Sequence, residues 1–342
     1  MLTALLPIPK FIHRNKCMHG VLEGRLIYQC LNIILLPLKQ AVRLGVMLPD
    51  SIGDMWYCFT LLTSYICNYP EAVMVAGVRG KTSPLTMAMF KQFGDSYCHQ
   101  PHSRQTTLAQ LLVAKSKTNP MDIKVFFREA QHFRLNGVSD PFWMDYPLAC
   151  PFFFLTPELL HYLHKEFWDH NARWCINLLG APEINFRFLV LQPITRSCHY
   201  KGGIIKPKQV MGHLHCDVQH CIVGMISGPA PPRFVIAIRA LMDFQYQVQA
   251  HHIDNHNINL ISAVLSEFHM HKDIVLKLQA RCGQEQNPIN NWHIPKLELM
   301  QSIKQTGVPQ QWTTNITEHA HVTDIKVPAR SSNNNNNKPQ IC

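Results

Sequence analysis

The second half of this sequence carries apolar residues at helical spacing almost without a break, and this pattern constrains the fold more than any other feature. The spacing holds in five stretches, around residues 155–178, 207–226, 233–248, 258–278 and 295–305. Glycine and proline lie between them, for example at Gly202-Gly203 and from Gly228 to Pro232. We therefore expect a helical domain over residues 151–305.

The first 150 residues show a mixed pattern instead. Residues 20–45 are typical of one helix that is kinked or split at Pro37. Residues 105–117 and 120–135 predict two further helices. Together with a strand described next, this predicts a fold that is mostly α with a small α/β part in residues 1–150.

One strand and one polar segment complete the expected organisation. Residues 56–66 are rich in aromatic and β-branched side chains, which favours a buried strand that ends before Asn68-Tyr69-Pro70. From residue 306 to 342 the chain is largely polar and contains a run of asparagines from Asn333 to Asn337. That composition favours a tail over a binding module.

Composition limits the class of protein. Lysine and arginine outnumber aspartate and glutamate by 32 to 22, which favours a nucleic-acid partner over an acidic protein, although the basic residues are scattered along the chain. The 12 cysteines include no C-x-x-C pair, and Pro7 and Pro9 break the apolar opening, so we expect reduced intracellular thiols and no secretory leader. The longest apolar stretch, Leu26 to Leu38, is too short to cross a bilayer, and we predict no membrane contact.

The stretch from Leu155 to Trp174 combines a helix start with chemically active side chains. Thr156 can cap the helix and Pro157 suits its first position. One face then carries Glu158, His161, Lys165 and Asp169. An acid-x-x-His pair on a helix can ligate a metal, relay a proton, or form a buried hydrogen bond that locks two elements together. The residues alone favour the structural lock over a place in an active site, and both over a solvated face.

Two other motifs are weaker. The segment His213 to Cys221, HLHCDVQHC, has metal-binding residue types at a spacing that fits helical packing better than a zinc site. The segment Val78 to Thr82, VRGKT, resembles a phosphate-binding loop, but Val75 stands where that loop needs its first glycine. We therefore reject a nucleotide site of that kind.

Histidine pairs occur at His269/His271 and His319/His321, too far apart in sequence to assign to one metal site. Glu318 precedes the second pair, and Asp324 follows it. Such a carboxylate can coordinate a divalent ion, or it can cap a helix or lie in a surface ion pair, and the residues alone favour the surface roles.

Four segments of the chain resemble transposases of the fungal Plavaka group, relatives of the CACTA elements. These are residues 64–84, 126–170, 291–303 and 317–333. The resemblance implies a nuclear enzyme with an RNase H-like core, in which three carboxylates hold two Mg or Mn ions that cleave and transfer DNA strands at transposon ends. It also implies a large helical insertion between the second and third acids. Residues 1–150 would then be a truncated RNase H-like part, 151–305 the insertion, and 306–342 a return segment with a polar tail.

The resemblance also maps the expected site onto this sequence. The second acid corresponds to Asn68, an amide, and the first is expected upstream of this sequence. The third acid corresponds to Glu318, which together with His321 lies in the motif E-x-x-H-x-x-x-I-K. Glu158 and His161 match a signature that braces the site. Where relatives carry a zinc-binding cysteine pair, this chain has Arg79 to Pro84, so no metal ligand is assigned there.

Two missing carboxylates out of three predict a protein that no longer cleaves DNA, because a two-metal site depends on those charges. Three functions stay open: a metal-dependent strand transferase, a DNA-binding or protein-interaction module without catalysis, and an element-derived product with no biochemical role. The sequence favours the third over the second, and the second over the first.

Overall fold

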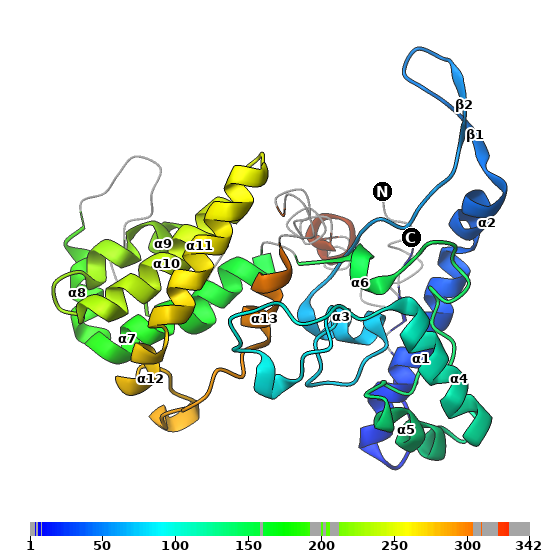
Figure 1. Ribbon diagram of the computed structural model, residues 1–342, viewed down its shortest axis with the longest axis horizontal. Helices are drawn as coiled ribbons and strands as arrows, with labels where there is room; N and C mark the ends of the chain where they lie inside the picture. Colours follow the sequence, from blue (N-terminus) through cyan, green and yellow to red (C-terminus); the bar gives the residue numbers. More distant parts are fainter. Residues whose placement is uncertain are drawn as a thin grey trace. The chain divides into compact units, whose positions relative to one another are not determined.

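The computed structural model is mostly helical, with two small two-stranded sheets (Figure 1). It describes residues 4, 6–7, 9–157, 160–191, 200, 203–205, 212–303, 309 and 321–327. The described residues fall into two compact units. The first contains those in 1–90, 99–156 and 315–342, and the second those in 91–98 and 157–314.

The first unit begins with two helices, α1 (His19–Ile34) and α2 (Leu36–Leu44), bent by 50° at their junction. This confirms the predicted split, since Pro37 occupies the first turn of α2. Strands β1 (Val46–Pro49) and β2 (Met55–Cys58) follow as an antiparallel hairpin.

The prediction of one strand over residues 56–66 is wrong. In the turn of the hairpin, a carboxylate oxygen of Asp50 accepts hydrogen bonds from the N–H groups of Ile52 and Asp54. The chain reverses there, so Met55–Cys58 pairs locally with β1 and leaves Trp56 exposed. Only Tyr65–Ile66 forms the later strand, β3.

Strand β3 pairs in parallel with β4 (Leu155–Thr156), with Tyr65 opposite Leu155. Helix α3 (Tyr69–Ala76) follows β3, and α6 (Pro151–Phe154) precedes β4. The core around them is aromatic, with the fully buried side chains Tyr28, Phe126, Phe142, Trp143, Tyr146 and Phe154. Two carbonyls in the last turn of α3 accept hydrogen bonds from the Tyr28 hydroxyl.

The two predicted helices of this unit are present as α4 (Arg104–Lys117) and α5 (Ile123–His132). Each starts where a side chain accepts a backbone N–H of the first turn, Ser103 for α4 and Asp122 for α5. They pack against each other through Leu111, Ala114, Phe126 and Ala130.

The second unit is helical, as the apolar spacing predicts. It contains π-helical segments at Leu160–His164 and Phe167–Ala172, followed by α7 (Arg173–Leu179), α8 (Ala181–Leu189), α9 (Gly212–Ile226), α10 (Pro232–Val248), α11 (Asn255–His271), α12 (Asp273–Lys277) and α13 (Pro295–Ser302). Helix α10 lies at the centre of its core and packs along α11 (Figure 1). A 3-10 turn at Gln284–Gln286 also belongs to this unit, whereas the 3-10 turn at Lys16–Met18 and the π-helical segment at His321–Lys326 belong to the first unit, and a 3-10 turn at Phe90–Gln92 lies where the chain passes from the first to the second.

The start of the helix predicted at Leu155 needs correction. Leu155 and Thr156 are strand residues, because both pair with β3, and the described helical backbone begins at Leu160. Thr156 is buried, and its hydroxyl lies 3.2 Å from that of Ser64. Its side chain therefore contacts the strand pair.

Candidate functional site

Asn68, the position of the expected second acid, lies directly after β3 and is the N-cap of α3. Its side-chain oxygen accepts a hydrogen bond from the backbone N–H of Glu71 at 3.0 Å. The first N–H groups of a helix have no partner within the helix, and asparagine is among the residues that satisfy them best. The amide at this position therefore has a structural use.

Glu71 is the carboxylate nearest to Asn68 in sequence. The hydroxyl of Tyr65 donates a hydrogen bond to it at 2.9 Å, which connects α3 to β3. Burial raises the pKa of Glu71, and the hydrogen bond from Tyr65 opposes this only in part. Glu71 is thus engaged with β3 through the Tyr65 hydroxyl.

The other predicted site residues are only partly covered by the structure. His161 lies in the π-helical segment Leu160–His164 of the second unit and is half-buried. Glu158 and Glu318 lie outside the described residues, and for His321 the structure describes the backbone only. The predicted approach of Glu318 to Asn68 and Glu158 therefore stays a prediction.

A metal ion does not fit the residues that the structure describes. Among them, no three His, Cys, Asp or Glu side chains lie close enough together to hold one. At the expected position, Asn68 is engaged as a helix cap and Glu71 as a partner of Tyr65.

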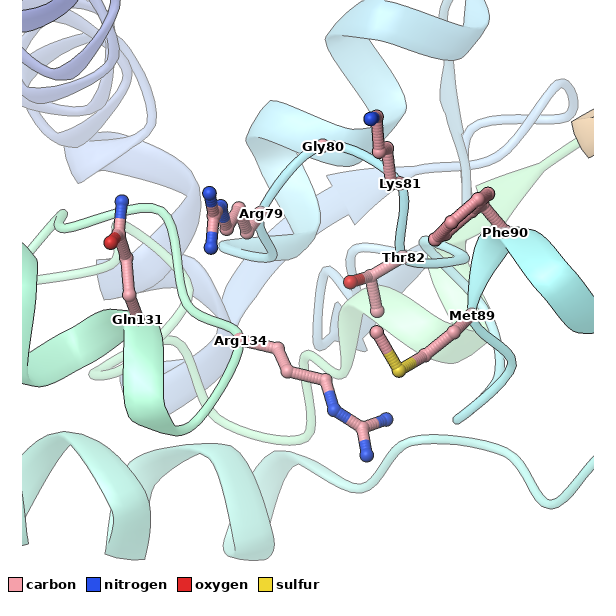
Figure 2. A pocket seen from close by; sticks show the side chains of 8 residues that line it. All are labelled: Arg79, Gly80, Lys81, Thr82, Met89, Phe90, Gln131 and Arg134. Carbon is pink, nitrogen blue, oxygen red and sulfur yellow. The ribbon is translucent and has the colours of Figure 1, made fainter.

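A basic pocket lies in the same unit, beyond the carboxyl end of α3 (Figure 2). Its cavity has a volume of about 500 Å³. It is lined by Arg79, Gly80, Lys81, Thr82, Met89, Phe90, Gln131 and Arg134, and we call it the basic pocket below.

One wall of the basic pocket is the loop that contains the VRGKT segment. The N–H of Thr82 donates to the carbonyl of Arg79 at 3.2 Å, which closes a turn with Lys81 at its third position. Lys81 has a φ of +70°, a conformation that favours glycine. The chain then folds back, with Thr82 opposite Met89 and the N–H of Phe90 donating to the carbonyl of Lys81 at 3.0 Å.

The second wall is the carboxyl end of α5. The N–H of Leu135 donates to the carbonyl of Ala130, and that of Arg134 to the carbonyl of Gln131, both at 3.0 Å. This pair of bonds closes a helix with a left-handed residue, usually glycine, and here Arg134 takes that place with a φ of +61°. Its guanidinium donates to the carbonyl of Met87 at 3.2 Å, which directs it to the loop.

The electrostatics of the basic pocket favour an anion. In the part of the chain that the structure describes, no carboxylate forms an ion pair with Arg79, Lys81 or Arg134. His102 contacts the carbonyl of Ser83 nearby, and burial, reinforced by the charge of Arg134, lowers its pKa to about 4. His102 is therefore neutral at physiological pH, and the positive charge comes from three side chains.

Sequence reasoning did not find this pocket. The loop is no nucleotide-binding P-loop, since no helix follows Thr82 and the chain instead returns to Met89. Its partner Arg134 is remote in sequence and carries no motif. The one local signal is a basic residue just before Asn136-Gly137, where α5 was expected to end.

The segment HLHCDVQHC lies in α9, in the second unit. Cys216 contacts the ring of His164 at 3.6 Å, His215 stacks on Trp168 and His220 stacks on Tyr246. These are contacts between packed helices, which agrees with the packing role that its spacing favours.

Comparison with known proteins places the first half of the chain. Residues 1–175 match the family model described as Plavaka transposase, which covers just over half of the sequence, including Asn68 and the basic pocket. This protein belongs to the Plavaka transposase family. It is thus a transposon-derived, transposase-like protein, and the family implies DNA as a possible partner and a divalent metal. No curated protein and no solved structure matches the chain.

One further property bears on the partners of this Plavaka-family protein. No single helix among the described residues is long and apolar enough to span a membrane, and only the bent pair of α1 and α2 reaches that length and composition together.

Proposed function

We propose that this member of the Plavaka family binds DNA and does not cleave it. The observation that carries the proposal is the role of Asn68. Its amide caps a helix at the position where the family resemblance implies a metal-binding carboxylate. The parallel pairing of β3 with β4, next to α3, supports an RNase H-like core around this position.

The chemical reason lies in charge. A two-metal nuclease holds its ions with carboxylates, which neutralise the ions and keep both on the scissile phosphate. A neutral amide supplies an oxygen but no charge, and the nearby Glu71 is engaged by the Tyr65 hydroxyl. The residues at the end of β3 therefore support the proposed loss of cleavage.

DNA contact is supported by different residues. The chain carries a formal net charge of +10, and the basic pocket gathers three cations without a described acidic partner. A protein that neutralises phosphates with such side chains releases counterions, so its affinity falls steeply with salt. This observation favours a DNA-binding protein over a product without any biochemical role.

The test uses the full chain and supercoiled plasmid DNA. We expect salt-dependent binding in a filter assay and no nicking in the presence of Mg²⁺ or Mn²⁺. Nicking that needs a divalent ion and is lost in Glu318→Ala would overturn the absence of cleavage. If the protein does not bind DNA even at low ionic strength, the remaining candidate is an element-derived product without a biochemical role. Nuclear localisation is part of the proposal, and a fluorescent fusion tests it.

A further inference from the structure

The composition of the basic pocket is more specific than a charged surface. Three cations come from two segments, while Phe90 and Met89 supply an apolar wall. We propose that the pocket binds a phosphate of single-stranded DNA and stacks the adjoining unpaired base on Phe90. This inference rests on the proposed DNA binding and names the form of DNA and the residues involved.

The phosphate would lie among the three basic side chains. Figure 2 shows Arg79 and Gln131 on one side of the space, Lys81 and Phe90 on the other, and Arg134 below them. Arginine suits phosphate because its planar fork can donate two hydrogen bonds. At Gly80, an added Cβ would meet nothing within 4 Å, so a ligand can approach the main chain closely at that point.

The base would take the place that a lysine partly occupies now. The ammonium of Lys81 lies 5.3 Å from the centre of the Phe90 ring. Since Lys81 is exposed and its stem is flexible, it can turn from the ring to a phosphate when a base arrives. Sites that combine cations with an aromatic platform bind single strands, because stacking needs a free base face, which a duplex covers.

The size of the cavity fits one nucleotide. Its volume of about 500 Å³ lies within the range of roughly 300–1,000 Å³ that is usual for small-ligand sites. Beyond a phosphate and one base, the rest of a strand would have to run outside. A short oligonucleotide is therefore the right probe.

The backbone of the basic pocket also carries strain. Lys81 and Arg134 both adopt a positive φ, and both line the cavity. Non-glycine residues in this conformation are uncommon, and they persist where other contacts hold them in place. Glycine at either position would relieve the strain but remove a cation, so the sequence keeps charge where conformation favours glycine.

The test measures fluorescence anisotropy of the full chain with a labelled oligothymidylate and with a duplex of equal length. We expect tighter binding to the single strand. Phe90→Leu should weaken single-strand binding by about fivefold or more, the scale of one stacked base, and leave duplex binding unchanged. Arg134→Gln and Lys81→Gln should each weaken binding of both probes, while Arg14→Gln, an exposed arginine outside the pocket, should change neither.

Each failure has its own meaning. If the wild-type protein binds DNA and all three pocket variants bind it equally well, the inference is overturned but the proposed function stands. If Arg134→Gln and Lys81→Gln lose affinity for DNA but Phe90→Leu keeps it, the single-strand assignment is overturned, because the pocket then contacts backbone phosphate alone. A further outcome is that inorganic phosphate inhibits DNA binding more than chloride does at equal ionic strength, while the protein shows no preference between single strand and duplex. That result assigns the pocket to a free anion and also overturns the inference. No DNA binding by the wild-type protein overturns both proposals.

Discussion

The backbone N–H of Arg79 donates a hydrogen bond of 2.7 Å to the carbonyl of Arg134, and this contact joins the two walls of the basic pocket. Beside it, Val78 pairs with Leu135 in an antiparallel bridge. Two cationic side chains from remote parts of the sequence are thus held together by main-chain bonds. Because these bonds do not depend on side chains, a substitution can remove a charge from the pocket without separating its walls.

Arg134→Gly is expected to stabilise the protein and weaken DNA binding at once. Arg134 ends α5 in a left-handed conformation. That conformation costs about 1–2 kcal/mol for a residue with a Cβ. Glycine adopts it freely but loses more entropy on folding, so we expect a net gain of about 0.5–1 kcal/mol in the free energy of unfolding. Urea unfolding and anisotropy would measure the two effects.

Arg134→Gln is the matched control, since glutamine keeps the strained backbone and loses the charge. It should bind DNA as weakly as the glycine variant without any gain in stability. If Arg134→Gly instead destabilises the protein, then the hydrogen bond from the Arg134 guanidinium to Met87 outweighs the relief of strain.

Asn68→Ala is expected to lower the free energy of unfolding by about 1 kcal/mol, the usual effect of removing a helix N-cap. The lost contact is the bond from the Glu71 N–H to the Asn68 side chain. Asn68→Asp should keep the stability, because a carboxylate accepts the same bond and is favoured by the helix dipole. Chemical denaturation measures both variants. Equal destabilisation by alanine and aspartate would show that the side chain acts through something other than the cap.

The local elements of this fold could be predicted, while the contacts that build the pocket could not. Helices α4 and α5 follow from capping residues and apolar spacing within short windows, and α10 and α11 likewise. Strands β3 and β4 have two residues each, too few for any periodicity, and they pair across a long stretch of sequence. Such a pairing is set by tertiary packing.

The candidate site shows the same division. Asn68 could be picked out by its place in a motif, but its cap role was not predicted, because no helix was expected at Tyr69–Ala76. The bond between Arg79 and Arg134 has no local signal: Arg79 lies in the VRGKT segment, but nothing in that segment indicates a contact with the end of α5, where glycine would be expected. The VRGKT segment resembles one loop type in sequence, but the helix end that it packs against lies more than fifty residues further along the chain.

Glu166 is expected to make the stability of the protein depend on pH. It is fully buried, where Gln245 donates to one carboxylate oxygen at 2.9 Å and Asn171 to the same oxygen at 3.3 Å. Among the residues that the structure describes, the second oxygen of Glu166 and the side-chain oxygen of Asn171 find no hydrogen-bond partner. A protonated Glu166 avoids burying a charge beside these unsatisfied oxygens. Burial is the main cause that raises its pKa to about 8, against an opposing effect of Lys296.

The sign of this effect follows from proton linkage. The folded state holds a proton that the unfolded state releases at its ordinary pKa of 4.5. The contribution is therefore complete below that value and is lost as pH rises through about 8. Burial lowers the pKa of His170 and His215 to about 4, so these histidines reduce stability only below their unfolded value of 6.5. Between pH 6.5 and 8 the loss of stability therefore comes from acids whose pKa is raised by burial, and among these the pKa of Glu166, at about 8, lies in this window.

Glu166→Gln separates the two contributions. Glutamine supplies the donor permanently, so thermal unfolding temperatures followed by circular dichroism should no longer fall between pH 6.5 and 8. The acid-side decline from the histidines should persist. A decline towards pH 8 that is as steep in the variant as in the wild type would show that Glu166 is not the group responsible.

The salt dependence of single-strand binding should distinguish the cations of the basic pocket from its aromatic wall. Each phosphate contact on a single strand adds about 0.7 to the slope of log affinity against log salt concentration. Arg134→Gln should therefore reduce the magnitude of the slope by about that amount. Phe90→Leu should lower the affinity with the slope unchanged, since stacking releases no counterions. If Phe90→Leu flattens the slope as well, the ring acts by holding Lys81 in place rather than by contacting a base.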